Sequence, residues 1–170
     1  MRPFLVKNFI SKEVAEECVN MLDVAVDEGK TEKDSQCPLS QAIYGLHKDL
    51  LDTMTDKMSE LTEYEVLPTY TYCRRYEEND ILKPHTDRPS CEISVTICLK
   101  NEVAPWAFHW VDGTVMMEAG DAVVYPGWKY VHWREPNDSG GRVWQVFLHY
   151  VDKNGPYAKQ HAYEQERKGI

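Results

Sequence analysis

The sequence lacks the features of secreted, membrane-spanning and disulfide-stapled proteins. Its opening stretch, MRPFLVKNFISKEV, has no signal-peptide core, and no apolar run approaches membrane-spanning length. The five cysteines are odd in number and form no C-x-x-C pair, so neither a disulfide framework nor a zinc ribbon is expected. We therefore expect a cytoplasmic protein in a reducing compartment, with no membrane partner.

The chain also lacks an excess of positive charge. It has 28 acidic and 19 basic residues and a formal net charge of −9, which argues against nucleic acid as a partner. It has no internal repeat and no low-complexity segment. A length of 170 residues suits one domain that buries most of its apolar surface, so we expect a single domain over residues 1–170. The oligomeric state stays open.

Residues 11–62 are expected to form two helices. Ser11 is placed to cap the first helix, whose apolar residues follow helical spacing as far as Gly29. The second helix is expected to begin near Ser40, because apolar residues then recur every three or four positions. The polar segment KTEKDSQCP between them is expected to be a loop.

Residues 64–151 differ from the preceding part in residue composition and spacing, and the difference predicts about eight short strands. Segments rich in β-branched and aromatic residues alternate with turn signals such as END, PG and NDSGG. Helices followed by such strands predict a mostly β, α+β fold, a sandwich or barrel with the helices packed on one outer face. The tail, residues 152–170, is polar and is expected to be a solvated extension.

Two His-x-Asp pairs raise the question of a metal site. His47 and Asp49 lie within the expected second helix, where positions i and i+2 point to different sides and cannot share an ion. His85 and Asp87 lie in or at the end of a strand, where i and i+2 share a face and can converge on one metal. On its own, the second pair is as consistent with a surface turn as with a metal site.

A third candidate ligand, His132, lies about 45 residues further on, on a different strand. It would complete a triad of two histidines and one carboxylate, which leaves open positions on the metal and is typical of non-haem Fe(II) oxygenases. Zinc ranks below iron, because neither Cys91 nor Cys98 has the spacing of a zinc pattern.

Arg142 heads the last strand, on the same face as Trp144 and Val146, and is expected to point into a barrel. A buried guanidinium needs an anionic partner, and no acid lies near it on that face, so a ligand carboxylate is favoured. An ion pair with an acid from elsewhere, or exposure at the strand start, stays open. Tyr76, nine residues before His85, is either a further contact to that ligand or an ordinary strand aromatic.

Three strings taken together resemble a known family. RRYEENDILKPHTD, then GDAVVYPGWKYVHW, then GGR are similar to the Fe(II)/2-oxoglutarate-dependent dioxygenases, and within them to the prolyl 4-hydroxylase-like branch. The resemblance covers about residues 64–151. It implies a double-stranded β-helix, a jelly roll of the cupin kind, closed on its metal site.

Carried to this chain, the resemblance implies that His85, Asp87 and His132 hold Fe(II). It implies that Arg142 binds the distal carboxylate of 2-oxoglutarate and that Tyr76 hydrogen-bonds this cosubstrate. The reaction would consume 2-oxoglutarate and O2, with ascorbate as an additional reductant, and would hydroxylate an unactivated C–H bond while releasing succinate and CO2. No side chain is expected to act as general acid or base.

The resemblance favours a prolyl residue of a peptide or protein as substrate, with a free amino acid or small metabolite as the alternative. The family's usual Gly-Gly is replaced by NEVAPWAFHWVDG, with Trp106, Phe108 and Trp110 alternating, which leaves prolyl specificity open. The nucleic-acid demethylase branch has a second Arg where Leu148 stands, and the Arg-x-Ser branch has Ser where Trp144 stands. Neither branch is therefore expected.

Two other classes of protein stay open. One is a non-catalytic, cupin-like module that binds a metal or ligand, and the other is a structural or interaction module in which the site residues are satisfied polar groups. Four tryptophans are candidates for the walls of a pocket, and each is as well explained by core packing: Trp106, Trp110, Trp128 and Trp144.

Overall fold

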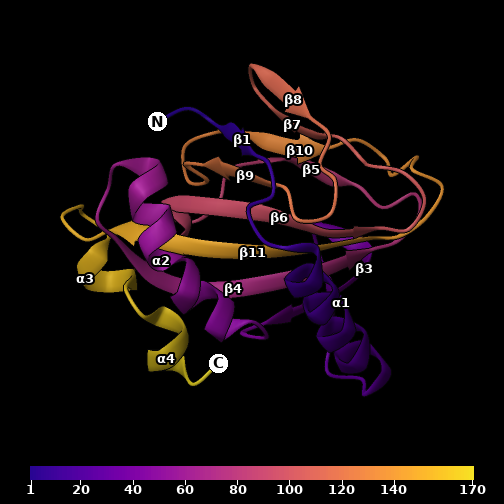
Figure 1. Ribbon diagram of the computed structural model, residues 1–170, viewed down its shortest axis with the longest axis horizontal. Helices are drawn as coiled ribbons and strands as arrows, with labels where there is room; N and C mark the ends of the chain where they lie inside the picture. The colour runs from indigo at the N-terminus through magenta and orange to yellow at the C-terminus, as the bar shows by residue number, and fades with distance from the viewer.

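The computed structural model describes residues 1–170 and contains two antiparallel β-sheets with helices against the larger one (Figure 1). In spatial order, the seven strands of the large sheet are β1 (Phe4–Val6), β9 (Ala122–Tyr125), β6 (Ile93–Asn101), β11 (Val143–Asp152), β4 (Val66–Tyr76), β3 (Cys37–Tyr44) and β2 (Glu32–Asp34). The four strands of the small sheet are β5 (Leu82–His85), β10 (His132–Arg134), β7 (Phe108–Trp110) and β8 (Gly113–Val115).

The chain passes back and forth between the two sheets from β4 to β11. Strands β4, β6, β9 and β11 belong to the large sheet, while β5, the β7–β8 hairpin and β10 belong to the small one. This alternation is that of a double-stranded β-helix, so the predicted fold and the predicted eight core strands are confirmed. Figure 1 shows the small sheet beside one face of the large sheet. Two of the metal-site candidates, His85 and His132, lie on β5 and β10 of the small sheet.

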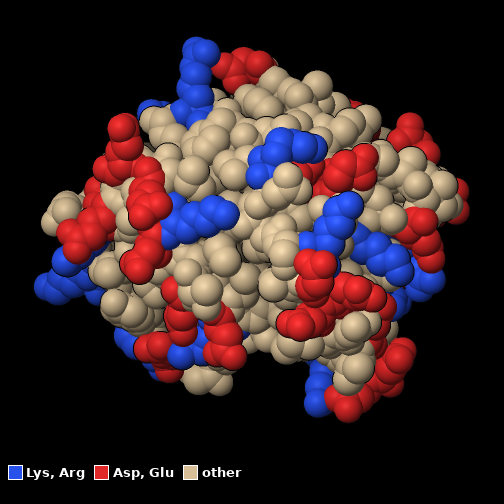
Figure 2. Space-filling model, viewed as in Figure 1, with Lys and Arg blue, Asp and Glu red and all other residues tan.

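Two long helices cover the other face of the large sheet. Helix α1 (Lys12–Asp27) begins at Ser11, whose side chain accepts a hydrogen bond from the backbone N–H of Val14, as the sequence predicted. Helices α1 and α2 (Lys48–Thr62) bury their apolar faces in one core with the outward side chains of β6, β9 and β11. Acidic and basic side chains are intermixed over this side of the molecule (Figure 2), and no helix is long and apolar enough to cross a membrane.

The second helix begins later than the sequence predicted. Residues 37–44 form β3 instead, and its Gln41–Tyr44 part pairs with β4, so the segment expected to be a loop closes a β2–β3 hairpin. His47 is the buried residue before α2 and lies outside the helix, and its Nε2 has no hydrogen-bond partner. Pairing with the edge of β4 decides the conformation here, because a short apolar spacing fits a strand as well as a helix.

The C-terminal tail is not a solvated extension. It forms the short helices α3 (Ala158–His161) and α4 (Glu164–Lys168), which follow β11 in the chain. A 3-10 turn (Pro89–Cys91) lies earlier, between β5 and β6. The side chain of Gln165 is buried, and its Oε1 accepts a hydrogen bond of 2.8 Å from the backbone N–H of Thr71 in β4. That bond and the burial of Glu164 hold the tail against the large sheet, so the prediction of a solvated tail was wrong.

We expect Leu22→Ala to lower the free energy of unfolding by about 3 kcal/mol, because Leu22 is fully buried between α1 and the sheet and its loss leaves a cavity. The matched control is Met21→Ala on the same helix, where the side chain is 47% exposed and the change should stay within about 0.5 kcal/mol. Urea unfolding of both variants measures the difference. Equal losses would contradict the packing of α1 on the large sheet.

Candidate metal and ligand site

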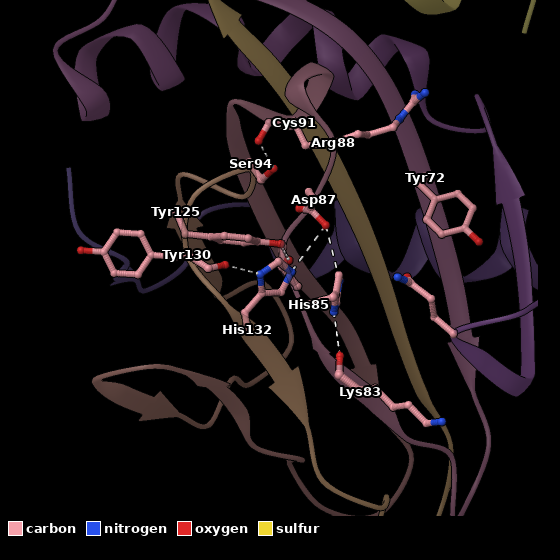
Figure 3. A network of polar contacts seen from close by, with 12 residues as sticks. Tyr72, Lys83, His85, Asp87, Arg88, Cys91, Ser94, Tyr125, Tyr130 and His132 are labelled. Carbon is pink, nitrogen blue, oxygen red and sulfur yellow. Dashed lines mark hydrogen bonds and ion pairs between the residues drawn. The ribbon is translucent and has the colours of Figure 1, made fainter.

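The structure brings His85, Asp87 and His132 together inside the double-stranded β-helix (Figure 3). His85 ends β5 and His132 begins β10, and the two are directly opposite each other in the antiparallel register of these strands. Asp87 follows β5 by two residues, and its Oδ1 lies 3.4 Å from Nε2 of His85 and 3.6 Å from Nε2 of His132. Three ligand atoms from two neighbouring strands therefore face one point.

Both imidazoles are oriented by the backbone. Nδ1 of His85 lies 2.8 Å from the carbonyl oxygen of Lys83, and Nδ1 of His132 lies 2.9 Å from that of Tyr130 (Figure 3). A carbonyl can only accept, so each Nδ1 donates and each Nε2 keeps its lone pair. Histidines that bind metals are typically held in this way, with the other ring nitrogen bonded to a carbonyl or carboxylate.

The electrostatics of Asp87 and His132 favour the charge states that metal binding needs. Burial alone would raise the pKa of Asp87, but its close contact with His85 and the neighbouring imidazoles of His132 and His149 lower it to about 2. Burial lowers the pKa of His132, and this outweighs the attraction of the Asp87 carboxylate. An ionised carboxylate and neutral imidazoles are the ligand forms that a divalent cation binds.

The triad lines a cavity of about 410 Å³. Five tyrosines form much of its wall: Tyr44, Tyr70, Tyr72, Tyr76 and Tyr125. Tyr76 is fully buried in this wall, and its contact with a ligand stays a prediction.

None of the four candidate tryptophans lines this cavity. Trp106 is buried behind Tyr76, with the two rings in an edge-to-face contact, and Trp144 packs on the helix side of the large sheet. Trp128 makes an edge-to-face contact with Tyr157 of the tail, and Trp110 packs against Phe108. Core or surface packing, the alternative left open for each, accounts for all four.

The structure places Arg142 outside the cavity. It precedes β11 on the side of Trp144, and that face of the strand packs against the helices, whereas Val143 and Phe147 face inward. The Arg142 guanidinium pairs with Glu102, with Nη2 2.9 Å from Oε1 and Nε 3.2 Å from Oε2. The prediction that Arg142 points into the barrel was wrong, and the alternative of an ion pair with an acid from elsewhere describes it.

Three other arginines in the cavity wall, Arg74, Arg88 and Arg134, were missed by the sequence reasoning. Arg74 on β4 is paired with Asp34 of β2 and donates to the hydroxyl of Tyr76 over 3.2 Å. Arg134 follows His132 by two residues on β10 and is 1% exposed. The signal for Arg134 was in the sequence, because i and i+2 of a strand share a face.

Solved structures with this architecture are similar to the chain over most of its length. A Pseudomonas putida prolyl-4-hydroxylase matches with a TM-score of 0.70 and 12% identity, over 88% of this chain and 92% of that one. A viral collagen prolyl hydroxylase from Paramecium bursaria Chlorella virus-1, in its 2-oxoglutarate complex, matches with a TM-score of 0.66 and 13% identity, over 88% and 96%. The chain shares the fold of these oxygenases.

The fold is not confined to prolyl hydroxylases. The non-haem α-ketoglutarate-dependent carbocyclase SnoK from nogalamycin biosynthesis matches with a TM-score of 0.72 and 13% identity, over 88% of this chain and 79% of that one. No family model and no curated protein matches the sequence. At these identities the likeness is one of fold, and the chemistry must be argued from the site.

Cys91 and His149 form a second group with Asp87, but their own contacts already satisfy them. The Cys91 sulfur lies 3.0 Å from the hydroxyl of Tyr70, and burial raises the pKa of this thiol to about 12. Nδ1 of His149 lies 2.9 Å from Oγ of Ser94. A protonated thiol is a poor metal ligand, so the group of His85, Asp87 and His132 is the better candidate.

We expect Asp34→Ala to lower the free energy of unfolding by about 3 kcal/mol, because it leaves the guanidinium of Arg74 buried without an acid. The side chain of Arg74 is only 7% exposed, so water cannot replace the lost carboxylate. Glu32→Ala, at an exposed position of the same strand, is the control. Urea unfolding that gave both variants the same small loss would show that the Arg74 pair is not needed.

Proposed function

We propose that this protein is an Fe(II)- and 2-oxoglutarate-dependent oxygenase that hydroxylates an unactivated C–H bond. The observation that carries the proposal is the convergence of two imidazole Nε2 atoms and one carboxylate oxygen in the cavity of a double-stranded β-helix. This donor set, with both Nδ1 atoms engaged by carbonyls, fits an octahedral Fe(II) with open positions. It has no fourth protein ligand of the kind that structural zinc takes.

His85, Asp87 and His132 would hold the iron in this cavity. With 2-oxoglutarate and O2, the iron would supply the activation of O2: one oxygen atom would enter succinate as 2-oxoglutarate loses CO2, and the other would enter the C–H bond of the substrate. Ascorbate would be the additional reductant that restores Fe(II). The chain orients these groups and excludes water and stray reductants. Burial raises the pKa of Tyr76 to about 12, so its hydroxyl stays protonated and able to donate to the cosubstrate.

The substrate we propose is a prolyl residue of a peptide or protein. Tyr44 is 49% exposed at the edge of the cavity, and its ring centroid lies 4.4 Å from that of Tyr72 and 5.6 Å from that of Tyr70. Proline-rich segments dock on exposed aromatic rings of this kind. A free amino acid or small metabolite is the alternative substrate, since SnoK acts as a carbocyclase on the same fold.

We expect His132→Ala to abolish stoichiometric Fe(II) binding under anaerobic conditions, because the two remaining ligands, His85 and Asp87, hold the ion far more weakly than three. The matched control is His109→Ala, since His109 lies on the neighbouring β7 and stacks on Trp133, away from the triad. Metal content after gel filtration measures the difference. Retention of iron by His132→Ala at the wild-type level would contradict the proposed metal site.

Substrate class is tested by reconstituting the protein with Fe(II), 2-oxoglutarate and ascorbate and measuring succinate released in air. Proline-containing peptides should raise succinate formation above the uncoupled background, and hydroxyproline should appear by mass spectrometry. Stimulation by free amino acids alone would favour the small-molecule alternative. Metal binding without any 2-oxoglutarate consumption would favour a non-catalytic binding module.

A further inference from the structure

Arg134 carries a buried charge for which the folded chain provides no acid. Its side chain is 1% exposed, and only Nη1 is bonded, to the carbonyl oxygen of Trp106 over 2.7 Å. Nε and Nη2 have no hydrogen-bond partner. Burial of an uncompensated charge costs several kcal/mol, so a position like this is expected to have a partner that the chain itself does not supply.

The unsatisfied atoms of Arg134 have the geometry of a carboxylate site. Nε and Nη2 lie along one edge of the planar guanidinium, so their two N–H groups point the same way and match the two oxygens of a carboxylate. The other sides of the group are covered by aromatic rings, with Cζ 4.7 Å from the ring centroid of Trp106 and 5.3 Å from that of Phe108. These rings hold the guanidinium in place and leave that single edge for a ligand.

The other arginines near the cavity are already neutralised. Arg74 is paired with Asp34, Arg88 with Glu164, and Arg142, outside the cavity, with Glu102. Arg134 is therefore the one guanidinium in the cavity wall that still lacks an anion.

The position of Arg134 relative to the triad selects the kind of anion. His132 and Arg134 are two residues apart on β10 and line the same cavity, so they are separated by about 7 Å along the strand. A molecule that reaches both the metal at His132 and the guanidinium needs a metal-binding group at one end and an anionic group at the other, and a short 2-oxo dicarboxylate has both. The length of a five-carbon 2-oxo diacid suits this span.

We propose that Arg134 binds the distal carboxylate of the 2-oxo acid cosubstrate through Nε and Nη2, in the place that the sequence assigned to Arg142. The inference rests on the proposed function and adds the residue that makes the site select a dianionic cosubstrate. Tyr76 lies 5.9 Å from Cζ of Arg134 by its ring centroid and is the neighbouring hydroxyl for the same carboxylate. Arg142 has no part in this binding.

The test compares two ligands on anaerobic, Fe(II)-loaded protein by calorimetry: 2-oxoglutarate, and 2-oxopentanoate, which has the same length without the distal carboxylate. Wild type should bind 2-oxoglutarate about 100-fold more tightly than 2-oxopentanoate. Arg134→Met, which keeps the side-chain length and removes the charge, should bring the two affinities to within about threefold. Arg142→Met is the matched control and should keep the wild-type preference.

Thermal unfolding gives a second measurement that does not depend on turnover. 2-Oxoglutarate should raise the melting temperature of wild type and Arg142→Met but not that of Arg134→Met, because a ligand stabilises only a form that binds it. Without ligand, Arg134→Met should be at least as stable as wild type, since an unpaired buried charge has been removed. If the Met variant does not fold, Arg134→Lys serves, with an affinity for 2-oxoglutarate about tenfold below wild type, because the ammonium lacks the two-donor edge.

The outcomes separate the two proposals. An undiminished preference for 2-oxoglutarate in the Arg134 variants, or its loss in Arg142→Met, would overturn the role of Arg134 and leave the oxygenase in place. Failure of Fe(II)-loaded wild type to bind either acid would overturn the proposed function and this inference together.

Discussion

The register between β5 and β10 is the constraint on which the site depends. Because His85 and His132 are directly opposite in this antiparallel pair, their rings meet at 4.4 Å between centroids, and Asp87 needs only the next turn of chain to reach both. A slip of one residue in either strand would turn one imidazole to the other face of the sheet. The carbonyl that holds Nδ1 of His85 belongs to β5, and the carbonyl that holds Nδ1 of His132 lies two residues before it, at the entry to β10, so register and ring orientation are set together.

Two buried arginines of the cavity wall differ in whether the chain supplies an acid to pair with them. Arg74 is neutralised from within the chain by Asp34, on the hairpin that closes this side of the cavity, and it contributes to stability. Arg134 is left without an acid, and we expect this to lower the stability of the ligand-free protein. Local costs of this kind persist where binding needs a group held in position before the ligand arrives. The aromatic rings around Arg134 supply part of the lost solvation while leaving its Nε–Nη2 edge open.

The sequence predicted the core of the fold well because the strands of that core can be recognised from local residue patterns. Strands of alternating or continuous β-branched residues between turn signals identified β4 to β11, and the shared face of i and i+2 separated His85 and Asp87 from the pair at His47. His132 was inferred as the third ligand because a metal site needs a further ligand from another strand. These inferences need only periodicity and ligand chemistry.

What the sequence did not predict depends on contacts between distant segments. Residues 37–44 carry no strong local preference, and pairing with β4 makes them a strand. Both faces of β11 are buried, one by helices and one by the cavity, so alternation alone cannot say which face Arg142 shares. The tail is polar in composition, yet Gln165 is buried because its amide completes a bond to the edge of β4.

The position of Arg134 changes how the two ends of the cosubstrate site are connected. With Arg142, the metal end and the carboxylate end would lie on different strands, β10 and β11, and their separation would depend on how the two sheets face each other. With Arg134, both ends belong to β10, and the separation is two residues of extended chain. Movement between the sheets would then widen or narrow the substrate side of the cavity, where Tyr44 and Tyr72 lie on β3 and β4, without stretching the cosubstrate site.

Strand β10 is only three residues long, yet it can hold both ends of the site in fixed positions. It is paired with β5 on one edge and β7 on the other, and the side chains of His132 and Arg134 are buried. In the proposed site, selection of the cosubstrate would thereby be separated in space from recognition of the substrate, and the aromatic side of the cavity could differ between proteins of this fold without changing cosubstrate binding.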